Sequence, residues 1–94
     1  MKTDLFRIDD TYCVYKFRIP EKFVGRLVND LHLYEEYHLK IIAVKKAEKV
    51  QNFIGIEYND TVVVNTTEDN LPLEPDDVLV CYGKESDFRK LCRL

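Results

Sequence analysis

Side chains that could act as nucleophiles, bases or metal ligands are few and far apart in this sequence. Ser86 is the only serine, and His32 and His38 are the only histidines. Nucleophilic catalysis needs an activated Ser or Cys beside a base, and zinc needs several ligands at short spacing. Ser86 stands where a helix is expected to begin, so we interpret it as a helix cap, and neither histidine lies at ligand spacing from a cysteine. These residues predict neither an enzyme nor a metal site.

The three cysteines, Cys13, Cys81 and Cys92, are odd in number and form no CxxC pair. A disulfide framework needs an even set, and a zinc site needs closer spacing. Each cysteine falls in register with apolar neighbours. This pattern indicates three buried, reduced thiols in a cytoplasmic protein that holds no cofactor through them.

Motifs that cradle phosphate or calcium are absent from the sequence. Neither GxGxxG nor GxxxxGK[ST] occurs, and the three glycines are scattered. An acidic cluster lacks the ligand order of an EF-hand, so we interpret it as the solvated face of a turn. Its members are Glu68, Asp69, Glu74, Asp76 and Asp77.

The length and charge of the chain set bounds on its class. Ninety-four residues make one domain, and a domain of this size buries a limited core, so dimerisation is expected to supplement it. A net charge of −3 argues against a general nucleic-acid binder but leaves room for one local basic pocket. No apolar run approaches the ~20 residues that span a bilayer, and the start of the chain lacks the apolar region of a signal peptide.

The spacing of apolar residues predicts a strand and then a helix in the first part of the chain. Residues 1–10 are interpreted as a lead-in or linker, and residues 11–94 as the domain. Strict alternation over 13–19 predicts a half-buried strand. From Glu21 to Leu31 the apolar residues follow helical spacing, although Gly25 interrupts the run.

The next stretch is expected to hold a polar corner, a strand and a charged connection. The corner covers 34–38 (YEEYH), where His38 is expected to take a positive φ. Leu39–Val44 is rich in β-branched residues and predicts a second strand. Residues 45–52 are interpreted as the connection that follows it.

Three more strands are expected before the end of the chain. The runs 52–58 and 61–65 are expected to pair as a hairpin through Asn59-Asp60. Residues 66–76, which contain two prolines, predict a long turn. The run 77–82 predicts the last strand, closed by Gly83.

The final segment has the residue order of a helix. Glu85 and Asp87 place acids at its start, an apolar stripe follows, and basic residues stand near its end. The element order is therefore β-α-β-β-β-β-α. This order predicts the α+β class, with a small mixed sheet and two helices packed on one face.

Three stretches of the chain share a pattern of residue types with a known family. Residues 19–33 run IPEKFVGRLVNDLHL and residues 37–46 run YHLKIIAVKK, and both resemble the opening of TrkA-C domains, also called RCK C-terminal domains. Residues 73–84 run LEPDDVLVCYGK, before Phe88 and Leu91. They resemble the family's closing Leu-x-x-Gly-Asp-x-Leu-x-x-x-Gly signature and its terminal helix.

The resemblance covers residues 12–46 and 61–94, and the chain departs from the pattern at a few positions. Residues 47–60 look longer than the usual connection. The single-residue departures are His38 and Asp76 in place of glycines, Thr67 in place of a common proline, and Lys46 in place of a common arginine.

The resemblance implies a regulator of potassium or other monovalent-cation transport. Such a lobe forms a homodimer in the cytoplasm and serves a membrane channel or transporter subunit, or a covalently linked nucleotide-binding lobe. The resemblance also implies that a small nucleotide, such as cyclic di-AMP, binds at the dimer interface. A two-fold symmetric ligand fits across a two-fold interface, because each half of the ligand meets the same residues.

For such a ligand, the sequence offers an apolar platform for adenine, cations for phosphate and hydroxyl donors. A lysine attracts phosphate as a point charge, without the fork of an arginine. The candidate ligand-binding residues are the platform Ile41, Ile42 and Ala43, the cations Lys45 and Lys46, and the donors Thr66 and Thr67. The alternative is that residues 41–44 form an ordinary core strand with a solvated end.

A second function is open at this point. The chain would then be a non-catalytic dimerisation or docking module of a cation transporter, antiporter or transcription regulator, with no small ligand. The sequence does not separate the two functions, because one strand edge can serve either a dimer or a ligand.

Overall fold

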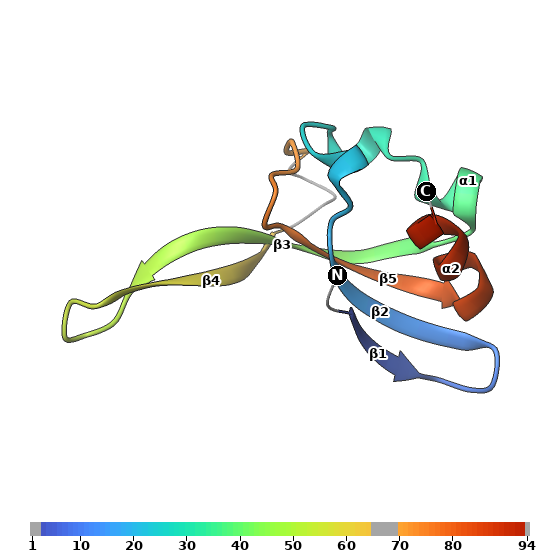
Figure 1. Ribbon diagram of the computed structural model, residues 1–94, viewed down its shortest axis with the longest axis horizontal. Helices are drawn as coiled ribbons and strands as arrows, with labels where there is room; N and C mark the ends of the chain where they lie inside the picture. Colours follow the sequence, from blue (N-terminus) through green and yellow to red (C-terminus); the bar gives the residue numbers. More distant parts are fainter. Residues whose placement is uncertain (1–2, 65–69, 94) are drawn as a thin grey trace.

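The computed structural model describes residues 3–64 and 70–93. Five strands form one sheet in the order β1-β2-β5-β3-β4 (Figure 1), and all four neighbouring pairs are antiparallel, where a mixed sheet was expected. The strands are β1 (Thr3–Arg7), β2 (Tyr12–Arg18), β3 (Lys40–Gln51), β4 (Glu57–Val64) and β5 (Val78–Lys84). The helical elements are the 3-10 turns η1 (Glu21–Phe23) and η2 (Val28–Asp30) and the α-helices α1 (Leu33–Tyr37) and α2 (Glu85–Arg93). The α+β class is confirmed.

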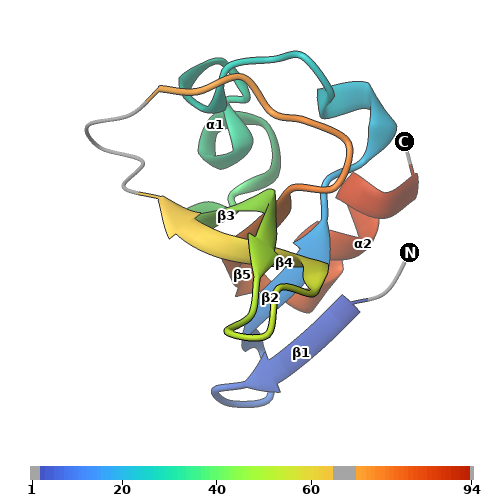
Figure 2. The same cartoon turned by 90° about the vertical axis from the view of Figure 1, so that its left-hand side faces the viewer.

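One face of the sheet carries the core, and both α-helices lie on that face (Figures 1 and 2). Every second residue of β2 and β5 is buried, as expected for strands that are covered on one side. Phe88 of α2 stacks on Tyr15 of β2, with ring centroids 4.2 Å apart. Leu33 of α1 belongs to the same buried cluster.

The segment 21–31, for which the sequence predicts a helix, forms the two 3-10 turns instead. Its backbone bonds to a distant segment, since the Gly25 N–H donates to the Leu73 carbonyl at 2.7 Å. Gly25 also has a φ of 84°, which is outside helical geometry. The apolar spacing still marked buried residues, because Phe23 and Leu31 are both in the core.

Helix α1 occupies most of the stretch expected to be a polar corner. It begins after His32 and ends at His38, and both histidines have positive φ, 52° and 57°. The expected left-handed conformation of His38 is therefore confirmed. Its N–H donates to the Tyr34 carbonyl at 2.9 Å, which closes the last turn of the helix.

Strand β3 runs through the residues expected to be a charged connection, and it forms a long hairpin with β4. Asn59 and Asp60 pair within β4 and are not the turn. The turn lies at 52–56, where the Asn52 side chain accepts hydrogen bonds from two backbone N–H groups and Gly55 has a φ of 89°. An Asn side chain that bonds its own turn, with Gly in the left-handed region, decided the position of the hairpin.

The two outer boundaries also differ from expectation. Residues 3–7, expected to be a lead-in, form β1 and pair with β2. Strand β5 continues through Gly83, which was expected to close it. A Cβ at Gly83 would lie 2.5 Å from Cδ2 of Leu39 and 3.2 Å from the His38 carbonyl oxygen, so any larger residue would have to displace the buried Leu39 side chain.

The β3–β4 hairpin projects far beyond the rest of the sheet (Figure 1). We call residues 48–60 the arm. The molecule measures 45 Å along its longest axis and 27 Å and 24 Å along the others. The longest axis is the one that includes the arm (Figure 1).

Candidate functional site

The predicted platform is divided between the two faces of the sheet. Ile41 is half-buried, lies opposite the buried Cys81 and packs against the core. The pairing of β3 with β5 shifts by one residue at Ile42, which is a β-bulge. Ala43 therefore lies opposite Val80 and faces away from the core. The bulge leaves Ile42 exposed and separates Ile41 from the other two residues.

Lys46 is an internal residue of the structure. Its ammonium donates to the carboxylate of the fully buried Asp77 and to the Pro72 carbonyl, and only 15% of its side chain is exposed. The Asp77 carboxylate also accepts from the N–H groups of Ala47 (3.0 Å) and Glu74 (2.8 Å). This ion pair joins the base of the arm to the segment before β5, so Lys46 is already occupied by a structural role.

Lys45 points to the face of the sheet that the helices leave uncovered. It lies opposite Val78 and Val63. The pKa of Lys45 is held below its usual value, chiefly by the nearby side chain of Lys16 and to a lesser extent by partial desolvation. Neighbouring residues of a strand face opposite sides, so Lys45 and Lys46 do not act together. Thr66 and Thr67 lie outside the described residues.

Ile41 does line a hollow, at the edge of β3 beside α1. In the described part of the chain, residues 40–43 of β3 pair only with β5, so their other edge is open. The hollow has a volume of about 580 Å³. Its lining combines apolar, aromatic, amide and basic side chains: Asn29, His32, Leu33, Tyr34, Glu35, Leu39, Lys40 and Ile41.

A second hollow, of about 730 Å³, adjoins the first and shares Tyr34 and Lys40 with it. Tyr12 and Tyr82 stack in it with ring centroids 5.5 Å apart, and the Lys84 ammonium lies over the Tyr12 ring. The remaining lining residues are His38, Gly83, Ser86, Asp87 and Lys90. We call the two hollows together the Tyr34–Lys40 surface. It brings aromatic faces and three lysine ammonium groups together.

Backbone strain marks the same place. His32 lines the first hollow and has a φ of 52° immediately before α1. A left-handed backbone on a residue other than glycine costs of order 1 kcal/mol or more and is concentrated at ligand sites. Its Nδ1 lies 4.0 Å from Oε2 of Glu35 in α1, a separation longer than a hydrogen bond.

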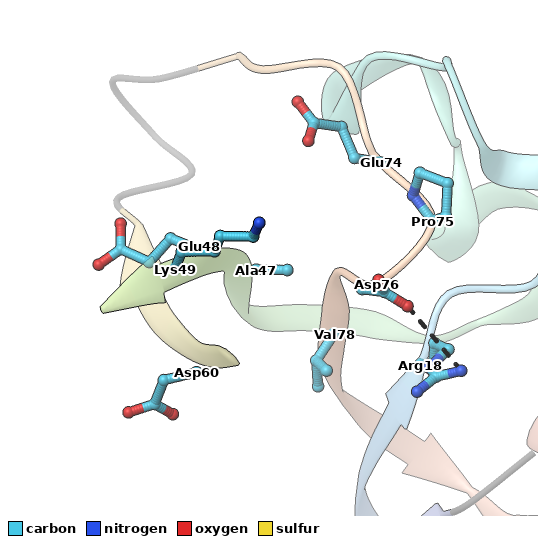
Figure 3. Close-up of a pocket in the computed structure, with 9 residues that line it drawn as sticks. All are labelled: Arg18, Ala47, Glu48, Lys49, Asp60, Glu74, Pro75, Asp76 and Val78. Carbon is cyan, nitrogen blue, oxygen red and sulfur yellow. Dashed lines mark ion pairs between the residues drawn. The ribbon is translucent and has the colours of Figure 1, made fainter. Parts of the chain in front are cut away.

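The third hollow lies at the base of the arm and has a volume of about 670 Å³ (Figure 3). Arg18 lies 3.9 Å from Asp76 there. The charged lining residues are Arg18, Lys49, Glu48, Asp60, Glu74 and Asp76. Four carboxylates against two cations disfavour phosphate, so this hollow is unsuited to an anionic ligand.

The cysteines and possible metal ligands follow the expectation only in part. Cys13 and Cys81 are buried, but Cys92 is exposed near the end of α2, contrary to expectation. The apolar stripe of α2 is Phe88 and Leu91, and Cys92 stands one position beyond it. Across residues 3–64 and 70–93, no group of three or more His, Cys, Asp or Glu side chains is arranged to hold a metal ion.

Sequence reasoning missed Tyr34 and Lys40, the two residues that link the hollows. The missed signal was the start of the second strand: Lys40 opens β3 opposite Tyr82, and its polarity in a β-branched run marks an exposed position.

Comparison with known proteins does not assign the chain to a family. No family model matches the chain, and no curated protein matches it. None of the helices in the described ranges has the length and apolar character to cross a membrane.

Proposed function

We propose that this chain is a regulatory, ligand-sensing module of a potassium or other monovalent-cation transport system, and that it binds a small nucleotide such as cyclic di-AMP. The observation that carries the ligand part is the Tyr34–Lys40 surface. Two adjoining hollows there share an exposed aromatic ring and a lysine, beside the edge of residues 40–43 that no other described strand pairs with. This location replaces Lys45 and Lys46 as the proposed phosphate contacts.

The chemistry of the surface suits a nucleotide. An adenine ring gains about 1–3 kcal/mol from stacking on an aromatic side chain, and Tyr34 offers an exposed ring. Among the described residues, Lys40 and Lys84 form no ion pair with a carboxylate, and both would attract phosphate. A homodimer would place two such surfaces about one two-fold axis, which matches the symmetry of a cyclic dinucleotide.

The transport part of the proposal rests on the resemblance to TrkA-C domains. The two charged positions that stand out in the separate motifs, Lys46 and Asp77, form one buried ion pair. Such an ion pair gives a physical reason for both motifs to occur in one chain, and so supports the resemblance. The proposed partners are a second copy of the chain and a membrane transporter subunit or linked nucleotide-binding lobe, in the cytoplasm.

Calorimetric titration tests the ligand. Cyclic di-AMP, another cyclic dinucleotide and AMP are titrated into the wild type and into Tyr34→Ala, Lys40→Ala and Lys45→Ala. We expect cyclic di-AMP to bind the wild type and to bind Tyr34→Ala and Lys40→Ala at least about tenfold more weakly, a loss of about 1.4 kcal/mol. Lys45→Ala, a matched lysine of the same strand that lines neither hollow, should bind normally. Equal weakening by Lys45→Ala would return the phosphate contact to Lys45.

A wild type that binds no nucleotide at high-micromolar concentration would favour the second function, a non-catalytic dimerisation or docking module. One observation supports that function specifically. Large apolar side chains are exposed along the arm, where they contribute nothing to the core of their own chain.

A further inference from the structure

The tip of the arm displays apolar side chains on an ordered turn. Phe53 is 99% exposed, and Ile54, Ile56 and Tyr58 are each about half exposed or more. The Asn52 side chain accepts from the N–H groups of Ile54 and Ile56 at 3.1 and 3.0 Å, so the turn is held in one conformation. Burying a side chain of this kind stabilises by about 1.5–3 kcal/mol. The arm therefore presents a rigid apolar surface that its own chain leaves in water.

The uncovered face of the sheet is a second surface of this kind. Phe6 and Val63 are exposed on it, and Val14, Val78 and Val80 are half-buried beside them. The strand registers place these residues in adjoining rows on the face opposite to the core. In the described part of the chain, no helix lies over this face (Figure 1).

The uncovered face is basic on balance. Lys16 lies opposite Val80, and Arg18 and Lys45 flank Val78, whereas Asp4 lies opposite Lys16 and Asp76 lies 3.9 Å from Arg18. Lys16 and Lys45 lie on opposite sides of β5, diagonally across Val78 and Val80, and Lys16 lowers the pKa of Lys45. Asp4, which lies opposite Lys16, and Asp60, which raises the pKa of Lys45, offset part of the repulsion between the two ammonium groups, and a further carboxylate between them would offset more of it.

The arm is acidic. It carries three carboxylates, Glu48, Glu57 and Asp60, against one lysine, Lys49. The arm thus complements the uncovered face in two ways: its apolar side chains match the apolar rows, and its acidic side chains match the basic ones. The arm projects away from its own sheet (Figures 1 and 2), so its tip can meet such a face only on another molecule. A bilayer fits less well, because anionic lipid attracts basic segments and would repel this one.

We propose that the arm of one copy of this chain docks across the uncovered sheet face of a second copy, and that the second copy reciprocates. Each copy holds one arm and one face, so a two-fold axis satisfies both contacts at once. The apolar tip covers the valine rows, and Glu48 and Glu57 approach Lys16 and Lys45 of the other copy. This inference does not rest on the nucleotide proposal, since it uses neither Tyr34 nor the hollow beside α1.

The first test is the oligomeric state, measured by sedimentation equilibrium from 1 to 200 μM without nucleotide. The wild type should sediment as a dimer of the 11.1 kDa chain. Phe53→Ser/Ile54→Ser should be monomeric while its far-ultraviolet circular dichroism is retained, because both side chains are exposed. Val24→Ser, which removes an exposed apolar residue elsewhere, should remain dimeric. A wild type that is monomeric throughout, or a dimer that survives the loss of Phe53 and Ile54, would overturn the proposal.

A charge-exchange pair tests the complementarity itself. Lys16→Glu/Lys45→Glu makes the face acidic, and Glu48→Lys/Glu57→Lys makes the arm basic, so each variant alone should be monomeric. A mixture of the two should form a heterodimer, because both arm-to-face contacts are then again between opposite charges. Failure of the mixture to dimerise, with both variants folded, would overturn the proposed register of arm and face.

The other possible partners of the arm correspond to separate outcomes of these tests. A monomeric wild type that cosediments with vesicles of phosphatidylcholine and phosphatidylglycerol would assign the arm to a bilayer and overturn this proposal. A monomeric wild type that binds cyclic di-AMP would overturn the arm contact and leave the nucleotide proposal intact. A wild-type dimer that depends on the arm but binds no nucleotide would support the arm contact and overturn the nucleotide proposal.

Discussion

The two halves of strand β3 both have extended, paired backbone but have opposite surroundings. In the first half, Val44 is fully buried and Lys46 reaches a buried carboxylate. In the second half, Glu48, Lys49 and Gln51 are exposed on the arm, and pairing with β4 is the only support that the strands provide. A strand is thus stabilised by what covers it. The half that nothing covers in its own chain is the half that is available to a partner.

The largest expected difference between the two halves comes from Asp77. Asp77→Ala leaves the Lys46 ammonium without its carboxylate and removes the acceptor of two backbone N–H groups. Breaking a buried ion pair at one partner costs about 3–5 kcal/mol, which is most of the stability of a small domain. Urea unfolding should show a mostly unfolded variant. Glu48→Ala, an acid lost from the arm instead, should unfold as the wild type does; a folded and stable Asp77→Ala would remove the distinction.

Truncation of apolar residues gives the next largest contrast. Leu31→Ala opens a cavity in the core and should lower the free energy of unfolding by about 2–5 kcal/mol. Phe53→Ala removes a larger side chain from the arm but should change the unfolding of the monomer by no more than about 0.5 kcal/mol. Chemical denaturation compares the two at a protein concentration at which sedimentation shows the wild type to be monomeric. Equal losses would show that the arm packs on its own chain.

The alkaline limit of stability should also be set by the covered region. Burial raises the pKa of Cys81 to about 12, from 9.0. The folded state keeps a proton that the unfolded state releases, so this contribution is complete below pH 9. It is lost as the pH rises from 9 towards 12, by at most about 1.4 kcal/mol per pH unit. Urea unfolding between pH 8 and 10.5 should give a flatter slope for Cys81→Ala, and a smaller change for Cys92→Ala, because desolvation also raises the pKa of Cys92 although its side chain is exposed.

The smallest expected effect tests whether the buried polar group on the covered face lacks a hydrogen bond. The Tyr15 hydroxyl is buried and has no hydrogen-bond partner among the described residues. Its burial, with a lesser influence of Cys13, also raises its pKa. Tyr15→Phe keeps the stack on Phe88 and removes the unsatisfied group, so it should be neutral or more stable by up to about 1 kcal/mol. Thermal unfolding measures this, and a loss above 1 kcal/mol would indicate a hydrogen bond at the hydroxyl.

The elements that the sequence predicted correctly are those whose patterns depend on local physics. The alternation of β2 and β5 and the acid-to-base order of α2 are direct consequences of strand pleat and helix dipole. His38 was placed in a left-handed turn because few residue types tolerate one. The core residues Phe23 and Leu31 were identified although their helix does not exist, because apolar residues are buried in either conformation.

What the tertiary structure decided is where each residue meets distant parts of the chain. The backbone of 21–31 pairs with Leu73 and its neighbours, which no local pattern could indicate. Lys45 and Lys46 look equivalent in the sequence, yet the strand pleat sends one to the uncovered face and the other to Asp77. Tyr34 and Lys40 become neighbours of Tyr12 and Tyr82 only when β2, β5 and β3 align. Local residue types therefore determined elements and core, whereas the site required contacts between residues far apart in the chain, because only packing sets their distance.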